Sequence, residues 1–163
     1  MDDKYECGNR SFIFVISSPG AGKGTLSRWL AEDNDFTHIS IGDMLREFGK
    51  GSGQMHKIIK GSFADPALVI LFDCSVAVAK ERVGGGIDPE DFDTRYYKYV
   101  NDNQRILLEY IAVFPEHRGK LVEINADGDA ATTYWILREA LRSKPEWSAL
   151  LDSSVSPPPS PSS

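Results

Sequence analysis

The 163-residue chain is predicted to form an α/β domain with a doubly wound parallel sheet. Short apolar runs alternate with segments of helical periodicity, which is the order that parallel strands and crossover helices require. The composition is globular, with 41% hydrophobic and 26% charged residues, and the length suffices for one such core. We place the domain at 11–142, between a flexible N-terminus at 1–10 and a Pro/Ser-rich tail at 143–163 that we expect to be disordered.

The predicted elements follow from apolar pattern and from flanking turn residues. The expected strands are 12–16, 36–39, 68–72 and 120–124. The expected helices are 23–32, 43–48, 54–60, 75–82, 91–113 and 129–142. Ligands of such sheets bind outside the carboxyl ends of the strands, so the loops at 17–24, 40–43, 73–75 and 125–129 should converge on one site.

The loop after the first expected strand has the sequence of a phosphate-binding turn. Residues 17–25 read Ser-Ser-Pro-Gly-Ala-Gly-Lys-Gly-Thr. Such a turn lets backbone N–H groups converge on an anion, and Lys23 adds a charge that reaches the β and γ phosphates. The generic pattern G-x-x-x-x-G-K-[ST] is missed twice, because Ser17 replaces its first glycine and Gly24 separates Lys23 from Thr25. The order strand, loop, helix predicts a P-loop NTPase-type fold, and the alternative is a plain glycine-rich connection.

A second motif follows the second expected strand. It reads Ser-Ile-Gly-Asp-Met-Leu-Arg at 40–46, where Asp43 can cap a helix and Arg46 lies one turn later. An arginine at this place could bind a second phosphate with its guanidinium fork. The alternative is a capped surface helix.

Charge and composition exclude several kinds of partner. A net charge of −6 and a pI near 5.0 argue against nucleic-acid binding. No apolar run is long enough to cross a membrane, and the acidic start is unlike a targeting peptide. Cys7 and Cys74 are too few for a disulfide framework and are expected to be free thiols. We therefore expect a cytoplasmic protein.

Together the two motifs resemble the nucleoside monophosphate kinases, specifically the adenylate kinase and UMP-CMP kinase family. The segments that carry the resemblance are Pro-Gly-Ala-Gly-Lys-Gly-Thr at 19–25 and His-Ile-Ser-Ile-Gly-Asp-Met-Leu-Arg at 38–46. Further similar segments lie at 71–82, 95–110 and 120–129, so the resemblance covers about 11–142. It implies a monomeric enzyme that transfers a phosphoryl group from ATP, with Mg²⁺, to UMP, CMP or AMP, and that has small-molecule nucleotides as its partners.

The resemblance also implies roles for individual residues. Lys23 and Arg95 would be catalytic, and Thr25 would bind the magnesium ion. Arg82 would pack on the donor base, although it could be only a helix-end cation, and Arg95 could merely pair with Asp91. The full ATP-binding set would be Pro19, Gly20, Ala21, Gly22, Lys23, Gly24, Thr25, Arg82 and Gly128. The acceptor-binding set would be Ile41, Gly42, Arg46, Gly61 and Arg95.

The chain departs from the family pattern between Gly61 and Leu68. Only 62–67 stand where the family has a helix, its third strand and the loop Asp-Gly-Phe-Pro-Arg. In the family that Asp serves the magnesium site, that Arg binds acceptor phosphate, and the strand lies between the first and second strands of the sheet. The triglycine at 84–86 also shortens the lid, so both the acceptor-binding and lid regions are expected to be reduced.

This departure leaves three functional alternatives. The first is an impaired kinase, and the second is a catalytically inactive nucleotide-binding relative with a regulatory or assembly role. The third is a P-loop kinase of another small metabolite, which the motif at 42–46 argues against. Ile41 occupies a position that is Thr in many adenylate kinases and Ala in UMP-CMP kinases, so it does not identify the acceptor base.

Overall fold

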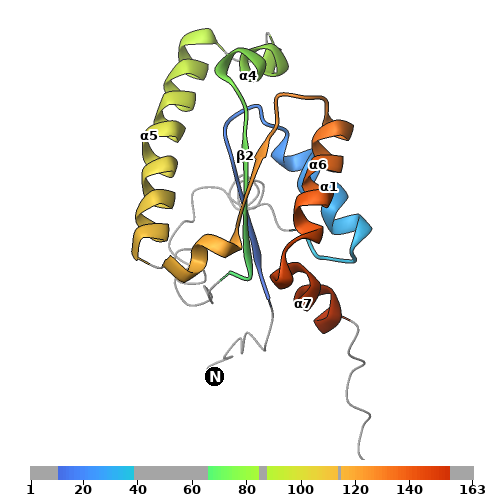
Figure 1. The fold of residues 1–163 in the computed structure, drawn as a ribbon. Helices are drawn as coiled ribbons and strands as arrows, with labels where there is room; N and C mark the ends of the chain where they lie inside the picture. Colours follow the sequence, from blue (N-terminus) through green and yellow to red (C-terminus); the bar gives the residue numbers. More distant parts are fainter. Residues whose placement is uncertain (1–10, 39–65, 85–87, 114, 155–163) are drawn as a thin grey trace, which may run out of the picture.

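The computed structural model describes residues 11–38, 66–84, 88–113 and 115–154 (Figure 1). Within them a parallel sheet has the strand order β1-β2-β3, with β1 at Ile13–Ser17, β2 at Leu68–Asp73 and β3 at Leu121–Asn125. Ile13 pairs with Leu68, and Val69 pairs with Leu121. Each strand lies within one residue of its predicted position, so the predicted parallel sheet is confirmed for these three strands.

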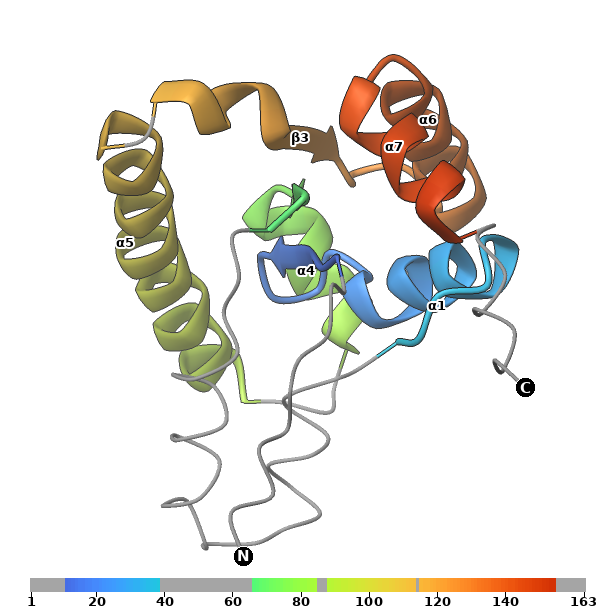
Figure 2. The same cartoon turned by 90° about the horizontal axis from the view of Figure 1, so that it is seen from below.

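Helices cover both faces of the sheet, as a doubly wound fold requires (Figure 2). On one side lies α5, Pro89–Val113, and on the other lie α1, Lys23–Asp33, and α6, Ala130–Arg142. The short helix α4, Val76–Val83, lies near the carboxyl end of β2, and the 3-10 helix η2, Pro115–Lys120, leads into β3 (Figure 1). None of the described helices has the length and apolar character needed to cross a membrane.

The core is centred on β2. Leu68, Ile70 and Phe72 alternate along this strand and are at most 1% exposed, as expected for the middle strand of a sheet with two covered faces. Leu26 of α1 and Leu137 of α6 complete the same buried cluster. By contrast, every residue of β1 is only partly buried, and the described residues place no strand along its second edge.

The expected strand at 36–39 is wrong over its described residues. Residues 36–38 are in neither strand nor helix. The N–H of Phe36 bonds to the Ala31 carbonyl at 2.9 Å, which closes the end of α1, and the Phe36 ring meets Trp147 edge-on at 5.7 Å. Its apolar side chain therefore packs on a helix rather than in a sheet. The expected helices at 43–48 and 54–60 lie outside the described residues.

The expectation of disorder from residue 143 onward is also wrong for its first part. Helix α7 spans Pro145–Ser154 and packs on α6. Trp147 and Leu150 are 7% and 8% exposed, so this short segment contributes to the core despite its polar and proline-rich surroundings. The ordered domain therefore extends at least to residue 154, and 155–163 lie outside the described residues.

Candidate functional site

The loop between β1 and α1 turns sharply through two glycines. Gly20 and Gly22 have φ values of +79° and +82°, a backbone region that side-chain-bearing residues adopt only with strain. Gly22 directly precedes α1 and offers no side chain to cap it. The predicted glycine-rich turn is thus present, with its two positive-φ positions at the second and fourth residues of Pro-Gly-Ala-Gly.

Gly20 also has no room for a side chain. A Cβ atom built on it would lie 2.9 Å from both the Cα and the carbonyl oxygen of Ala79, in the middle of α4. Ala79 itself is fully buried. The loop backbone therefore lies directly on α4, and the small size of both residues makes this contact possible.

The base of the loop is bonded to β2. The N–H of Ser18 bonds to the Phe72 carbonyl at 3.2 Å, and the Ser18 hydroxyl accepts from the N–H of Cys74 at 3.2 Å. The Cys74 carbonyl in turn accepts from the Tyr96 hydroxyl of α5 at 2.7 Å. Burial raises the pKa of Tyr96 above its ordinary value, which keeps the phenol protonated as this donor. Cys74 is a free, buried thiol, as expected.

The first turn of α1 presents unpaired donors to solvent. Its first helical hydrogen bond runs from the N–H of Leu26 to the Gly22 carbonyl at 3.0 Å, so the N–H groups of Lys23, Gly24 and Thr25 precede the helical pattern. All three of these residues are exposed. Together with the positive end of the helix dipole and the Lys23 ammonium, these N–H groups are arranged as a candidate anion-binding site.

Arg82 joins this loop to the loop after β3. Its guanidinium donates from Nη1 to the Gly20 carbonyl at 3.3 Å and from Nη2 to the Gly128 carbonyl. Three residues predicted separately from sequence are thereby brought together at the carboxyl ends of β1 and β3. The described arrangement uses the guanidinium as a link between two backbone segments.

The loop after β3 has its own fixed geometry. The Asp127 carboxylate accepts from the N–H of Ser75 at 2.7 Å, which ties this loop to the start of α4. The N–H of Asp127 bonds to the Asn125 side chain at 2.8 Å, and Asp129 caps α6 by accepting from the N–H of Thr132 at 2.9 Å. Hydrogen bonds from Thr132 hold the pKa of Asp129 below its ordinary value.

Arg95 lies on α5 and is exposed. The structure shows no ion pair between it and Asp91, which was the alternative reading of this residue, and none with any other residue it describes. Two residues earlier, Asp93 pairs with Lys80 of α4 at 2.7 Å, which ties α5 to the helix that carries Arg82. The structure thus assigns Arg95 no role of its own.

The predicted acceptor-side residues Ile41, Gly42, Arg46 and Gly61 lie outside the described residues. The sequence reasoning missed Ser18, Ala79 and Asp127, each of which acts through a contact with a distant segment. The sequence marks Ser18 only by its place beside the glycine-rich loop, and its burial is visible only in the structure. Nothing local marks the other two.

The hydrogen-bond donors of this turn suit the phosphates of a nucleoside triphosphate. Uncapped N–H groups and Lys23 can bind phosphate oxygens, and the exposed Thr25 hydroxyl lies in the same turn as a possible magnesium ligand. No group of three or more His, Cys, Asp or Glu side chains that could hold a metal occurs in the part of the chain that the structure describes.

Comparison with known proteins supports this assignment of the loop. A family model described as an AAA domain matches residues 17–67. This match and the parallel sheet with its covering helices show an α/β P-loop NTPase fold.

Similarity to individual proteins is partial. Over 60 residues the chain is 43% identical to the uridylate kinase of Saccharomyces cerevisiae, which is 36% of this chain and 29% of that protein. It is 40% identical over 60 residues to human adenylate kinase isoenzyme 5, covering 37% of this chain and 10% of that protein. With an adenylate kinase of Lactococcus lactis it shares 34% identity over 71 residues, 44% of this chain and 33% of that protein. The matched stretches span a third or less of these relatives.

Proposed function

We propose that this protein is an ATP-dependent phosphotransferase acting on a nucleoside monophosphate, UMP, CMP or AMP, with activity reduced by the missing segment. The observation that carries the proposal is the anion-binding turn at 20–25, held against α4 and linked by Arg82 to the loop around Gly128. The partial similarity to uridylate and adenylate kinases supports the choice of acceptor class.

Each residue has a stated role in this proposal. The backbone of 20–25 binds the β and γ phosphates of ATP, and Lys23 neutralises charge that develops on the transferred group. Thr25 is the protein ligand of Mg²⁺, which supplies further charge neutralisation when bound. Arg46 binds the acceptor phosphate and Arg95 reaches the phosphates from α5. No side-chain base is needed, because the acceptor phosphate oxygen is itself the nucleophile.

The expected impairment follows from the size of electrostatic contributions to this reaction. Phosphoryl transfer depends on positioning and charge, and one transition-state arginine is worth about 10³ to 10⁵ in rate. The chain lacks the Asp-Gly-Phe-Pro-Arg segment and the expected lid arginine. We therefore expect binding of nucleotide to persist while turnover falls toward the detection limit of coupled assays.

Binding is tested by calorimetry with Mg-ATP and Mg-ADP. Lys23→Ala removes the charge in the first turn of α1 and should weaken binding about tenfold or more. Arg28→Ala is the matched control, because it removes an exposed cation from the same helix one turn further on. Equal affinities of the two variants would show that the loop is not the nucleotide site.

Activity is tested with CMP, UMP and AMP, each offered with Mg-ATP. The parent chain should give slow transfer, and a chain with the family segment inserted between Gly61 and Leu68 should be faster by orders of magnitude. Full turnover by the parent chain would contradict the impairment, and an inactive restored chain would contradict the kinase assignment.

The second candidate is a catalytically inactive relative that binds ATP or ADP in a regulatory or assembly role. The absence of the Asp-Gly-Phe-Pro-Arg segment favours it. This candidate predicts that the parent and the restored chain bind nucleotide with the same affinity. Neither chain should transfer a phosphoryl group to any of the three acceptors.

A further inference from the structure

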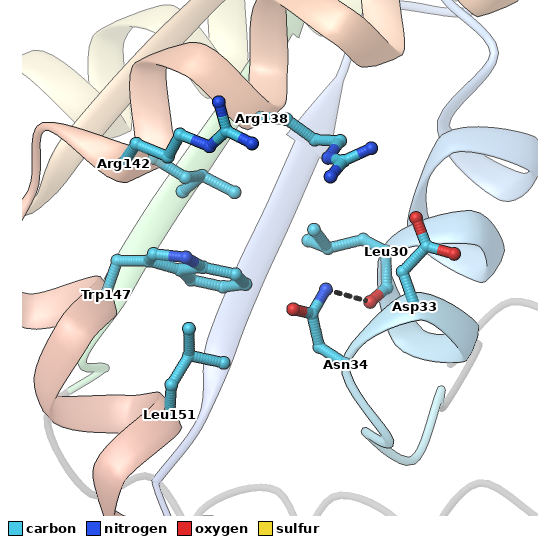
Figure 3. A pocket seen from close by; sticks show the side chains of 8 residues that line it. Leu30, Asp33, Asn34, Arg138, Arg142, Trp147 and Leu151 are labelled. Atoms are coloured by element: carbon cyan, nitrogen blue, oxygen red, sulfur yellow. Dashed lines mark hydrogen bonds between the residues drawn. The ribbon is translucent and has the colours of Figure 1, made fainter.

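A cavity of about 490 Å³ lies at the end of α1 farthest from the phosphate-binding turn (Figure 3). This volume is in the range of small-molecule sites, about 300–1,000 Å³. Leu30 is the first residue of α1 that lines the cavity, so about 10 Å of helix separates the cavity from Lys23 at the turn. The nucleotide of the proposed function therefore does not account for it. Its walls come from the C-terminal ends of α1 and α6 and from α7.

The floor of the cavity is apolar and well packed. Leu30, Leu141 and Trp147 line it and are all buried. The Trp147 ring is held in place by its edge-on contact with Phe36, and its indole faces the cavity (Figure 3). A ligand would therefore find this surface already formed.

The polar wall contains an arginine, Arg138, that forms no hydrogen bond or ion pair within the described part of the chain. Arg142 is paired with Glu139 at 2.6 Å, and Asp33 accepts from the Tyr134 hydroxyl at 2.6 Å. The Arg138 guanidinium lies beside Leu30 and Asp33 (Figure 3).

Asn34 adds a fixed acceptor to the same wall. Its Nδ2 donates to the Leu30 carbonyl at 2.8 Å, which leaves Oδ1 directed toward the cavity (Figure 3). The lining thus combines the Arg138 guanidinium and the Oδ1 acceptor of Asn34 with apolar side chains. Planar guanidinium groups bind carboxylate and phosphate oxygens through paired hydrogen bonds.

We propose that this cavity binds a small organic anion, with its carboxylate or phosphate on Arg138 and its apolar body against Trp147 and Leu30. The occupant is a small amphipathic acid, since the cavity combines the Arg138 guanidinium with the apolar side chains of Leu30, Leu141 and Trp147. A hydroxyl or amino group on the ligand would meet Oδ1 of Asn34. The site is separate from the phosphate-binding turn and does not depend on the proposed kinase activity.

The test is an NMR titration of the ¹⁵N-labelled full chain. The three tryptophans give three indole signals, assigned with Trp29→Phe and Trp135→Phe variants. Phenylacetate and phenyl phosphate are the carboxylate and phosphate probes, and benzyl alcohol is the neutral control. We expect one or both acids to shift the Trp147 signal saturably and more than the Trp135 signal, and benzyl alcohol to bind more weakly. The stronger acid identifies which anionic group the site prefers.

Variants and competition decide the assignment. Arg138→Gln should weaken binding about fivefold or more, whereas Arg28→Gln, on the exposed face of α1, should leave it unchanged. Mg-ADP should not displace the probes. The proposal is overturned by an absence of saturable shifts at millimolar probe, by equal binding of benzyl alcohol, by unchanged binding in Arg138→Gln, or by displacement with Mg-ADP. A chain that fails to bind Mg-ADP but still binds the acids refutes only the proposed function.

Discussion

Three alanine substitutions, two in the loop before α1 and one in its first turn, can separate backbone strain from steric contact. Gly20 has both a positive φ and a Cβ position 2.9 Å from the Ala79 backbone. Gly22 has a positive φ, but the nearest atom to its Cβ position is a Leu26 methyl at 3.8 Å, an ordinary contact. Gly24 has neither constraint, since nothing lies within 4 Å.

The expected losses of stability differ accordingly. The left-handed backbone costs a residue with a side chain about 1–2 kcal/mol, which is the whole effect expected for Gly22→Ala. Gly20→Ala adds overpacking against backbone atoms that cannot rotate away, about 1–3 kcal/mol, for a total of about 2–5 kcal/mol. Gly24→Ala in the first turn of α1 should leave stability unchanged or raise it by up to about 1 kcal/mol.

Urea unfolding followed by circular dichroism measures the three differences in unfolding free energy. They are obtained from the shifts of the urea midpoint, provided that the dependence of the free energy on urea concentration is the same in all variants. We expect the midpoints in the order Gly24→Ala, Gly22→Ala, Gly20→Ala. If Gly20→Ala unfolds at the midpoint of Gly22→Ala, the loop does not lie on α4 as described. If it matches Gly24→Ala, both the strain and the contact are refuted. A Gly20→Ala chain that does not fold agrees with the reasoning only when the other two variants fold normally.

Other residues give further tests. Trp147→Ala should destabilise the chain by about 3–5 kcal/mol, whereas Trp135→Ala, at a side chain 64% exposed, should change the unfolding midpoint little. Ser18→Ala should cost about 1–3 kcal/mol in the same assay, because it leaves the buried N–H of Cys74 without its acceptor. Burial raises the pKa of Tyr99 to about 12, so between pH 10 and 12 the unfolded chain ionises this phenol more readily than the folded chain does. The contribution of Tyr99 to stability is therefore fully present below pH 10 and is lost as the pH rises to about 12. Tyr99→Phe should flatten that loss in unfolding measured between pH 9 and 12.

The local part of this fold was predictable from sequence because short-range patterns determine it. Apolar runs bounded by turn residues marked all three described strands within one residue. Helix starts were less well placed. Ser75 and Asp129 were assigned to helices that they in fact cap, since a capping residue has non-helical backbone although it lies beside the helical pattern.

The errors arose where distant segments decide the structure. Phe36 looked like part of a strand, but its ring packs on Trp147, far away in the chain. The segment at 145–154 looked too polar to fold, yet two side chains, Trp147 and Leu150, bury enough surface against the domain to order a helix. In the candidate site, the glycine-rich motif and Arg82 were singled out from sequence and their proposed roles stay predictions, whereas the small residue required at Ala79 becomes visible only through its contact with Gly20.

The contacts that hold the phosphate-binding turn bear on the choice between an impaired kinase and an inactive relative. The turn is bonded to the Phe72 carbonyl and the Cys74 N–H, packed on Ala79, and linked through Arg82. All four residues follow the stretch between Gly61 and Leu68 where we propose that the family segment is missing. On this proposal, the chain keeps these supports of the turn but lacks the groups expected to act on the acceptor phosphate and on magnesium. Nucleotide binding and phosphoryl transfer should consequently be separable in this chain, with affinity for Mg-ADP retained and only the transfer rate restored by the inserted segment.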